Sequence, residues 1–105
     1  MDENKSTHII IQSSRHTAYY SEQETAEYSR LEVQVIRELH DAGVIEGISV
    51  EGEEPRYSEE EVAVLRRARR LHEELGINLE GVEVILRLYA RLDALQRELE
   101  QYRRR

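Results

Sequence analysis

The chain has 105 residues, enough for one domain, and carries a formal net charge of −7 with a pI near 5.1. Phosphate binding needs a cationic surface, so this net charge argues against nucleic acid as a partner and favours a basic protein. The sequence contains no cysteine, which excludes a disulfide framework, thiolate zinc sites and cysteine catalysis, and which fits a reducing cytoplasm.

We expect residues 1–18 to form a flexible N-terminal segment, because residues 1–8 are largely polar. The run Ile9–Ile11 that follows is long enough for a short strand at most. It is too short for a signal peptide or a membrane span. The sequence therefore predicts a cytoplasmic protein without a membrane anchor.

Three predicted helix starts have the same pattern, a serine followed three residues later by a glutamate. In such a capping box, the serine hydroxyl accepts a hydrogen bond from a free N–H of the first turn, and the glutamate accepts one from the serine N–H. The pairs are Ser21 with Glu24, Ser29 with Glu32, and Ser58 with Glu61.

The first two boxes predict a short helix over residues 22–28 and a second over residues 30–42, which ends at Gly43. Almost nothing separates these helices, so they are expected to form a tight helix–turn–helix corner. Residues 44–57 then alternate apolar and polar side chains around the turn-forming residues 51–55, which predicts a small two-stranded wing.

The third box begins a helix over residues 59–75, with Gly76 as its stop. Its predicted apolar stripe is Val62, Leu65, Ala68, Leu71 and Leu75. Arg66, Arg67, Arg69 and Arg70 lie at its flanks, where pairing with nearby glutamates explains them better than a nucleic-acid patch does.

Asn78 caps a last helix that is expected to reach the C-terminus. Its apolar side chains recur at spacings of three and four residues, as in a coiled coil, and a small head cannot cover them all. We therefore predict a homodimer, which would also supplement a core that contains no Phe or Trp. The predicted dimerisation residues are Ile85, Leu88, Leu92, Leu95, Leu99 and Tyr102.

The sequence contains no pattern that predicts catalysis or a bound cofactor. The four histidines lack metal-ligand spacing, no G-x-S-x-G elbow is present, and the five glycines are isolated. His40 and His72 are interpreted as half-buried helix residues. We predict neither an enzyme nor a metal or cofactor site.

Charge divides unevenly between the two halves of the chain. Residues 21–61 hold 13 acidic and 3 basic side chains, a balance of −10, whereas residues 62–105 hold 10 arginines and 7 acidic side chains, a balance of +3. The predicted organisation is thus a flexible segment over 1–18, an acidic head over 19–77 and a dimerisation helix over 78–105.

The order of these elements resembles the MerR-like superfamily of winged helix–turn–helix proteins over roughly Tyr19 to Gln101. The wing ends in the sequence RYS at residues 56–58, and residues 75–86 read LGINLEGVEVIL. The element G-I-N-L-x-G-V is shared by the HspR type of heat-shock repressor and the CbpM family of chaperone modulators. Arg67-Ala68, Arg70-Leu71, Glu74-Leu75 and the helix at Gly81-Val82 resemble CbpM especially.

This resemblance implies a mainly α fold with a small β-wing and a long C-terminal helix. DNA-binding members have an arginine-rich second helix and a basic wing, whereas here Arg37 is the second helix's one remaining cation beyond the cap, and the wing reads EGEEP. Glutamates repel phosphates, so the surface is expected to avoid DNA.

CbpM-type proteins inhibit a DnaJ-like co-chaperone, CbpA, by binding its J-domain and blocking contact with Hsp70. The resemblance therefore implies a J-domain as the partner, with complementary charge steering the encounter. The candidate contact residues are Glu32, Glu38, Asp41, Glu46, Glu51, Glu53 and Glu54. Candidate apolar anchors are Val33, Val35, Val44 and Ile45, for which core packing is the competing interpretation. The alternatives are a DNA-binding regulator of HspR type and an adaptor for another basic protein.

Overall fold

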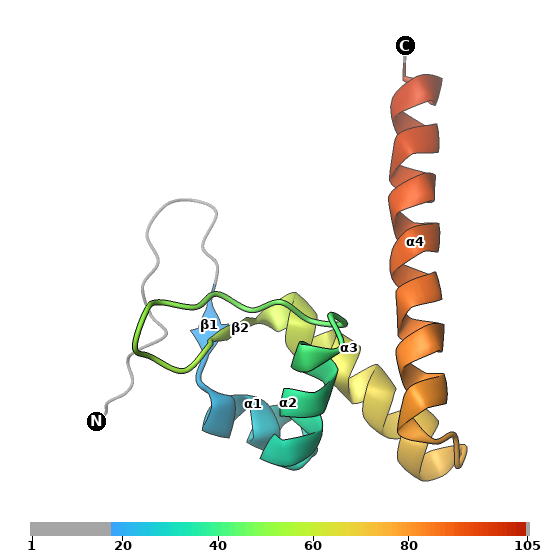
Figure 1. The fold of residues 1–105 in the computed structure, drawn as a ribbon. Helices are drawn as coiled ribbons and strands as arrows, with labels where there is room; N and C mark the ends of the chain where they lie inside the picture. Colours follow the sequence, from blue (N-terminus) through green and yellow to red (C-terminus); the bar gives the residue numbers. More distant parts are fainter. Residues whose placement is uncertain (1–17, 105) are drawn as a thin grey trace.

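The computed structural model describes residues 18–104 of the chain (Figure 1). A small sheet and a helical head precede one long helix, which confirms the predicted fold class. The elements are β1 (Tyr19–Tyr20), α1 (Glu22–Ser29), α2 (Val33–Asp41), β2 (Tyr57–Ser58), α3 (Glu59–Arg69), the π-helix η2 (Arg70–Glu74) and α4 (Leu79–Arg103). The predicted strand at Ile9–Ile11 and the predicted flexible segment, apart from Ala18, lie outside the described residues.

The small sheet joins the start of the head to the end of the wing. Strands β1 and β2 pair antiparallel, with Tyr19 opposite Ser58 and Tyr20 opposite Tyr57. Within the wing, the described residues form one isolated antiparallel bridge, in which Ile48 and Arg56 exchange two backbone hydrogen bonds of 2.8 and 2.9 Å. The predicted wing is therefore present, but its returning strand pairs mainly with β1.

Two of the three predicted capping boxes form. Ser21 and Glu24 exchange both hydrogen bonds at the start of α1, and Ser58 and Glu61 do so at the start of α3. At α4, the Asn78 side chain accepts from the Gly81 N–H at 2.8 Å, as predicted.

The box predicted at Ser29 is wrong. Ser29 is the last residue of α1 and is buried, and α2 begins only at Val33, with Glu32 as its N-cap. Arg30 between them has a left-handed φ of 63°. The chain turns here so that Leu31 enters the core, and burial of that side chain outweighs the hydrogen bonds that a capping box would supply.

The end of α2 is fixed by Gly43, as the sequence predicts. With a φ of 83°, Gly43 donates to the His40 carbonyl, and Val44 donates to the Leu39 carbonyl, which is the Schellman arrangement. Arg87 of α4 donates to the Ala42 carbonyl at 2.7 Å. The last helix is thereby attached to the C-terminal end of α2.

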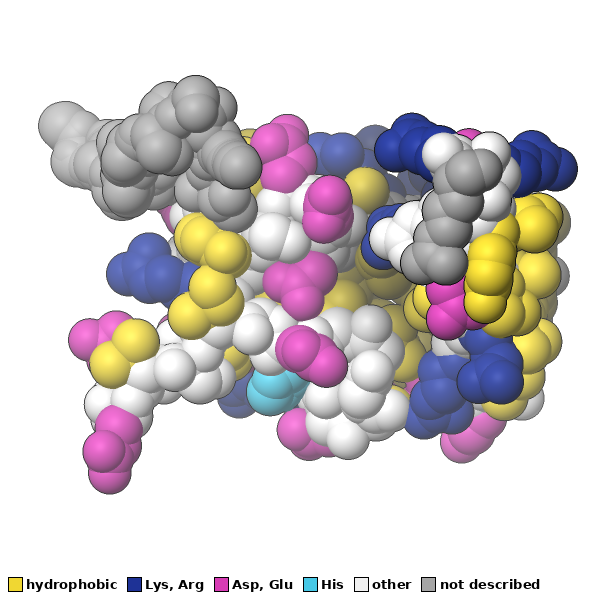
Figure 2. All heavy atoms as spheres, turned by 90° about the horizontal axis from the view of Figure 1, so that it is seen from above, with side chains coloured by type: hydrophobic (Ala, Val, Ile, Leu, Met, Phe, Trp, Pro, Cys, Tyr) yellow, Lys and Arg dark blue, Asp and Glu magenta, His cyan; other side chains and the backbone are white. Residues whose placement is uncertain are grey.

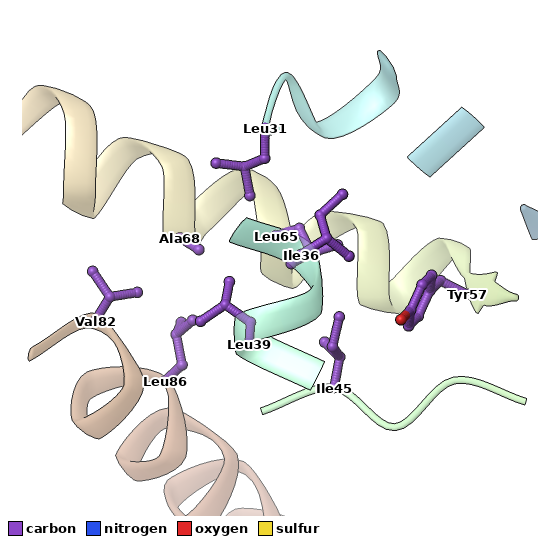
Figure 3. Packing of buried hydrophobic residues seen from close by; sticks show 9 residues of the cluster. All are labelled: Leu31, Ile36, Leu39, Ile45, Tyr57, Leu65, Ala68, Val82 and Leu86. Carbon is purple, nitrogen blue, oxygen red and sulfur yellow. The ribbon is translucent and has the colours of Figure 1, made fainter. Parts of the chain in front are cut away.

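One hydrophobic core joins the head to the beginning of α4 (Figure 3). Leu86 of α4 lies next to Leu39 of α2, and Val82 points toward Ala68 of α3. The first two turns of the long helix are thus part of the head. The core consists of Leu31, Ile36, Leu39, Ile45, Tyr57, Leu65, Ala68, Val82 and Leu86.

The predicted stripe of the third helix is correct except at its end. Val62, Leu65 and Ala68 are buried and Leu71 packs against the core, but Leu75 is 68% exposed. The helix widens to the π form over Arg70–Glu74 and ends there, so Leu75 stands beyond the reach of the core. The His72 ring nitrogen Nδ1 lies 2.7 Å from the Ile77 carbonyl oxygen and helps to hold the link to α4.

Candidate functional site

The seven acidic residues predicted to contact a partner are all exposed. Glu38 and Asp41 lie one turn apart on α2, and Glu46 follows shortly after that helix. Glu51, Glu53 and Glu54 lie on the wing, whereas Glu32 lies at the opposite end of α2. The structure therefore brings together the three wing carboxylates and separates Glu32 from the C-terminal end of α2. Acidic side chains gather over the head in Figure 2.

Arg37, the cation that the second helix retains, is bound to a carboxylate of the protein itself. Its Nε and Nη2 atoms donate to the two oxygens of Glu22 at 2.9 and 3.0 Å. Glu22 is buried, and the hydrogen bond from Arg37 holds the pKa of this carboxyl below its ordinary value despite the opposing effect of burial. A bidentate pair of this kind neutralises the guanidinium and fixes its orientation.

Glu46 and Gly47 form the stem of the wing. The carboxylate of Glu61, which completes the capping box of α3, also holds this stem. Glu61 Oε1 accepts from the Ser58 N–H at 3.0 Å, and Oε2 accepts from the Glu46 and Gly47 N–H groups at 3.1 and 2.9 Å. The wing is thus attached to the first turn of α3 by one side chain.

Gly47 allows the stem to pack directly on a buried ring. Its φ is 69°, and a Cβ atom at this position would lie 2.9 Å from Cε1 of Tyr57 and 3.1 Å from the Arg56 carbonyl oxygen. No other residue type fits this conformation and this space. Burial raises the pKa of Tyr57 to about 12, because the phenolate form would lose its hydration.

The wing exposes two apolar side chains among its acidic ones. Ile48 is 46% exposed and Val50 is 57% exposed. They are separated by Ser49 alone, between the bridge at Ile48 and the turn that begins at Val50. Beyond them the Glu53 N–H donates to the Val50 carbonyl at 2.9 Å, and Gly52 has the positive φ that a type II turn requires at its third position.

The apolar anchors suggested by the sequence are not available on the surface. Ile45 is buried in the core, and Val35 and Val44 pack against it. Val33 is half-buried at the start of α2. Core packing is therefore the correct interpretation for Ile45, Val35 and Val44, and the exposed apolar pair of the wing was missed because its alternating pattern indicated only a strand.

The arginines of α3 are largely engaged within the molecule. Arg66 donates to the Tyr28 carbonyl at 3.1 Å, and Arg69 lies 3.5 Å from Glu73 and 3.2 Å from Glu74. The predicted pairing with Glu73 and Glu74 is thus confirmed at Arg69. Of the four arginines at residues 66–70, Arg69 is thus neutralised by carboxylates.

A groove of about 660 Å³ lies between the head and the part of α4 that follows its first two turns. Arg67 of α3 spans it, with its guanidinium carbon 4.8 Å from the centre of the Tyr89 ring on α4. The groove has both acidic and basic side chains at its edges, including Glu60, Asp93 and Arg97. It was not predicted from the sequence, because it depends on the angle between α3 and α4.

The predicted dimerisation residues are exposed along α4 except for Ile85, which is half-buried. Figure 2 looks down on α4 and shows hydrophobic side chains on the side of the helix that faces away from the head. The exposed fractions are 57% for Leu88, 58% for Leu92, 51% for Leu95, 51% for Leu99 and 70% for Tyr102.

Two other kinds of site are absent from the described part of the chain. Residues 18–104 contain no group of three or more His, Asp or Glu side chains placed to hold a metal ion. No helix in the same range is both long and apolar enough to cross a membrane.

Comparison with known proteins identifies one family. The family model described as MerR HTH family regulatory protein matches residues 20–104. The match begins in β1 and ends just beyond α4, so it covers both the head and the long helix. No curated protein matches the sequence significantly.

Proposed function

The chain belongs to the MerR HTH regulatory family, and from this premise we propose that it is a homodimeric chaperone modulator of the CbpM type. In this proposal it binds the J-domain of a DnaJ-like co-chaperone and competes with Hsp70 for it. The resemblance of residues 67–86 to CbpM supports the assignment within the family. The single observation that carries the proposal is the charge of the second helix, α2.

That helix offers no free cation at Arg37, because Glu22 neutralises it through two hydrogen bonds. Glu38 and Asp41 add negative charge to the same helix. A surface of this kind repels DNA phosphates, since each neutralised cation removes one electrostatic contact. The same surface suits a basic protein face, for which complementary potentials increase the association rate and the specificity.

Titration of the purified protein with an isolated J-domain tests the proposal. We expect a complex with a dissociation constant below about 50 µM that weakens as salt is raised. No binding at about that concentration would overturn the proposal. Salt-sensitive binding to duplex DNA of mixed sequence would instead support a DNA-binding regulator.

Charge reversal locates the contact. The triple variant Glu51→Lys, Glu53→Lys and Glu54→Lys is expected to bind the J-domain at least ~10-fold more weakly. The control is Glu80→Lys, Glu98→Lys and Glu100→Lys, which makes the same change in net charge at exposed positions of α4. Equal weakening by both sets would show that only overall charge matters.

A further inference from the structure

The wing combines three properties that a protein-binding anchor needs: exposed apolar area, a hydrogen-bonded backbone and a mainly acidic surrounding, in which the exposed Arg56 opposite Ile48 is the one cation among residues 44–57. We infer that Ile48 and Val50 form the apolar anchor of the interface and that they dock against an apolar depression on a basic face of the J-domain. This inference rests on the proposed function, which it deepens by naming the residues that hold the partner.

The exposed apolar area lies on the arm of the wing that leads into its turn. About half of each of the two side chains is exposed; Ile48 is bridged to Arg56, and Val50 is the first residue of the turn at Val50–Glu53. In Figure 2 the wing projects from the head on the side away from α4 and carries apolar and acidic side chains together. A partner docked there would leave the exposed side of α4 uncovered.

The backbone that carries the pair is already ordered at both ends. Ile48 is bridged to Arg56, and the preceding Glu46 and Gly47 N–H groups are held by the Glu61 carboxylate. Gly47 also rests against the Tyr57 ring. Such preorganisation reduces the conformational entropy lost on binding, so a small apolar contact is enough to matter.

The charge around the pair selects the partner. Four exposed glutamates flank Ile48 and Val50 in the chain, namely Glu46, Glu51, Glu53 and Glu54, and they outnumber the single exposed Arg56 that lies opposite Ile48. Apolar side chains supply most of the energy of an interface, and a charged rim adds steering and specificity. An acidic rim around an apolar pair fits a protein surface with a basic rim around an apolar depression.

The double variant Ile48→Thr with Val50→Thr tests the inference. It keeps β-branching and thus the backbone preference of the wing, while it removes most of the apolar area. Isothermal titration with the isolated J-domain is expected to show at least ~10-fold weaker binding. The control is Leu75→Thr, which changes a more exposed apolar residue far along the chain from the wing, and it is expected to bind like the wild type.

The salt dependence of Kd distinguishes the contribution of the apolar anchor from that of the acidic residues around it. Loss of the apolar pair should weaken binding at every salt concentration without changing the slope of log Kd against log salt, because no charge is altered. Charge reversal at Glu51, Glu53 and Glu54 should reduce that slope. Unchanged protection of the backbone amides at positions 48 and 56 in hydrogen exchange would show that the wing of the double variant keeps its fold.

The outcomes distinguish the two proposals. If the wild type binds the J-domain and the double variant binds within twofold of it, the anchor is refuted and the proposed function stands. If the wild type does not bind, both are refuted. Weaker binding by the double variant with an intact wing and an unchanged salt slope supports the anchor.

Discussion

Glu22 shows how a single carboxylate changes the charge of a helix–turn–helix surface. It is buried at the start of α1 and accepts hydrogen bonds from Nε and Nη2 of Arg37 on α2. Helix α2 thereby loses its available cation, while α1 and α2 gain a link between their side chains. An ion pair of this kind neutralises charge and also holds the corner together.

The ion pair predicts a particular loss of stability in acid. The pKa of Glu22 in the folded protein is lowered from 4.5, mainly by the hydrogen bond from Arg37. Since the folded value lies below the unfolded one, the pair stabilises the fold above the ordinary carboxyl range and this contribution is lost as pH falls through the folded pKa. We expect the urea midpoint of Glu22→Gln to fall less than that of the wild type between about pH 6 and about pH 3.

The matched control for this experiment is Glu27→Gln, which changes an exposed carboxylate of the same helix. Its urea midpoint should follow the wild-type pH dependence. Identical pH profiles for all three proteins would show that Glu22 does not contribute to acid sensitivity.

At the scale of single residues, the sequence predicts local hydrogen bonds well and burial less well. The boxes at Ser21 and Ser58 were correct because their partners lie three residues away. The box at Ser29 failed because the burial of Leu31, a tertiary effect, decides the backbone there. Which apolar residues of the wing are exposed also depends on tertiary packing, so Ile48 and Val50 could not be singled out from the pattern alone.

At the scale of elements, Glu61 connects two parts of the head. It completes the capping box of α3 and also accepts two N–H groups from the stem of the wing. Glu61→Ala removes all of these bonds, and we expect it to lower the free energy of unfolding by about 2–4 kcal/mol in urea denaturation. Hydrogen exchange should become faster at the Glu46 and Gly47 amides.

Glu24 is the natural control, because it occupies the same capping position on α1 without a contact to the wing among the hydrogen bonds of the described residues. Glu24→Ala should lower the free energy of unfolding by about 1 kcal/mol and leave exchange at Glu46 and Gly47 unchanged. Equal effects of the two substitutions would mean that the bonds from Glu61 to the wing contribute nothing.

The elements themselves were largely predictable, because helix periodicity and glycine stops are local signals. Gly43 and Gly76 both have the positive φ expected at helix ends. Strand β1 was not predicted, since two residues carry no periodicity and its partner, Tyr57–Ser58, lies far along the chain. The π-helix over Arg70–Glu74 has no signal in the sequence pattern that we can identify.

At the scale of the whole molecule, two surfaces lie on opposite sides. The wing projects from one side of the head, and α4 stands at the other (Figure 1). Figure 2 shows hydrophobic side chains on the side of α4 that faces away from the head. Helix α4 spans about 37 Å at 1.5 Å per residue, and only its first turns reach the core. The arrangement leaves room for one partner at the wing and a second copy of the chain at α4.

The geometry of α4 predicts how the dimer would be disrupted. Leu95 and Leu99 are each about half exposed, and burial of the exposed half contributes roughly 1 kcal/mol per side chain. A symmetric dimer buries each of them twice, so Leu95→Asp with Leu99→Asp removes about 4 kcal/mol before any repulsion between the aspartates. The dimer dissociation constant should therefore rise at least ~1000-fold.

Sedimentation equilibrium measures this change directly. The wild type is expected to have the mass of a dimer at micromolar concentration, and the double variant the mass of a monomer. Leu75→Asp is the control, because Leu75 is exposed but lies before α4. A dimer that survives the double substitution would place the interface elsewhere. A monomeric wild type would mean that the exposed side of α4 binds a different protein, since a helix with this much exposed leucine requires a partner.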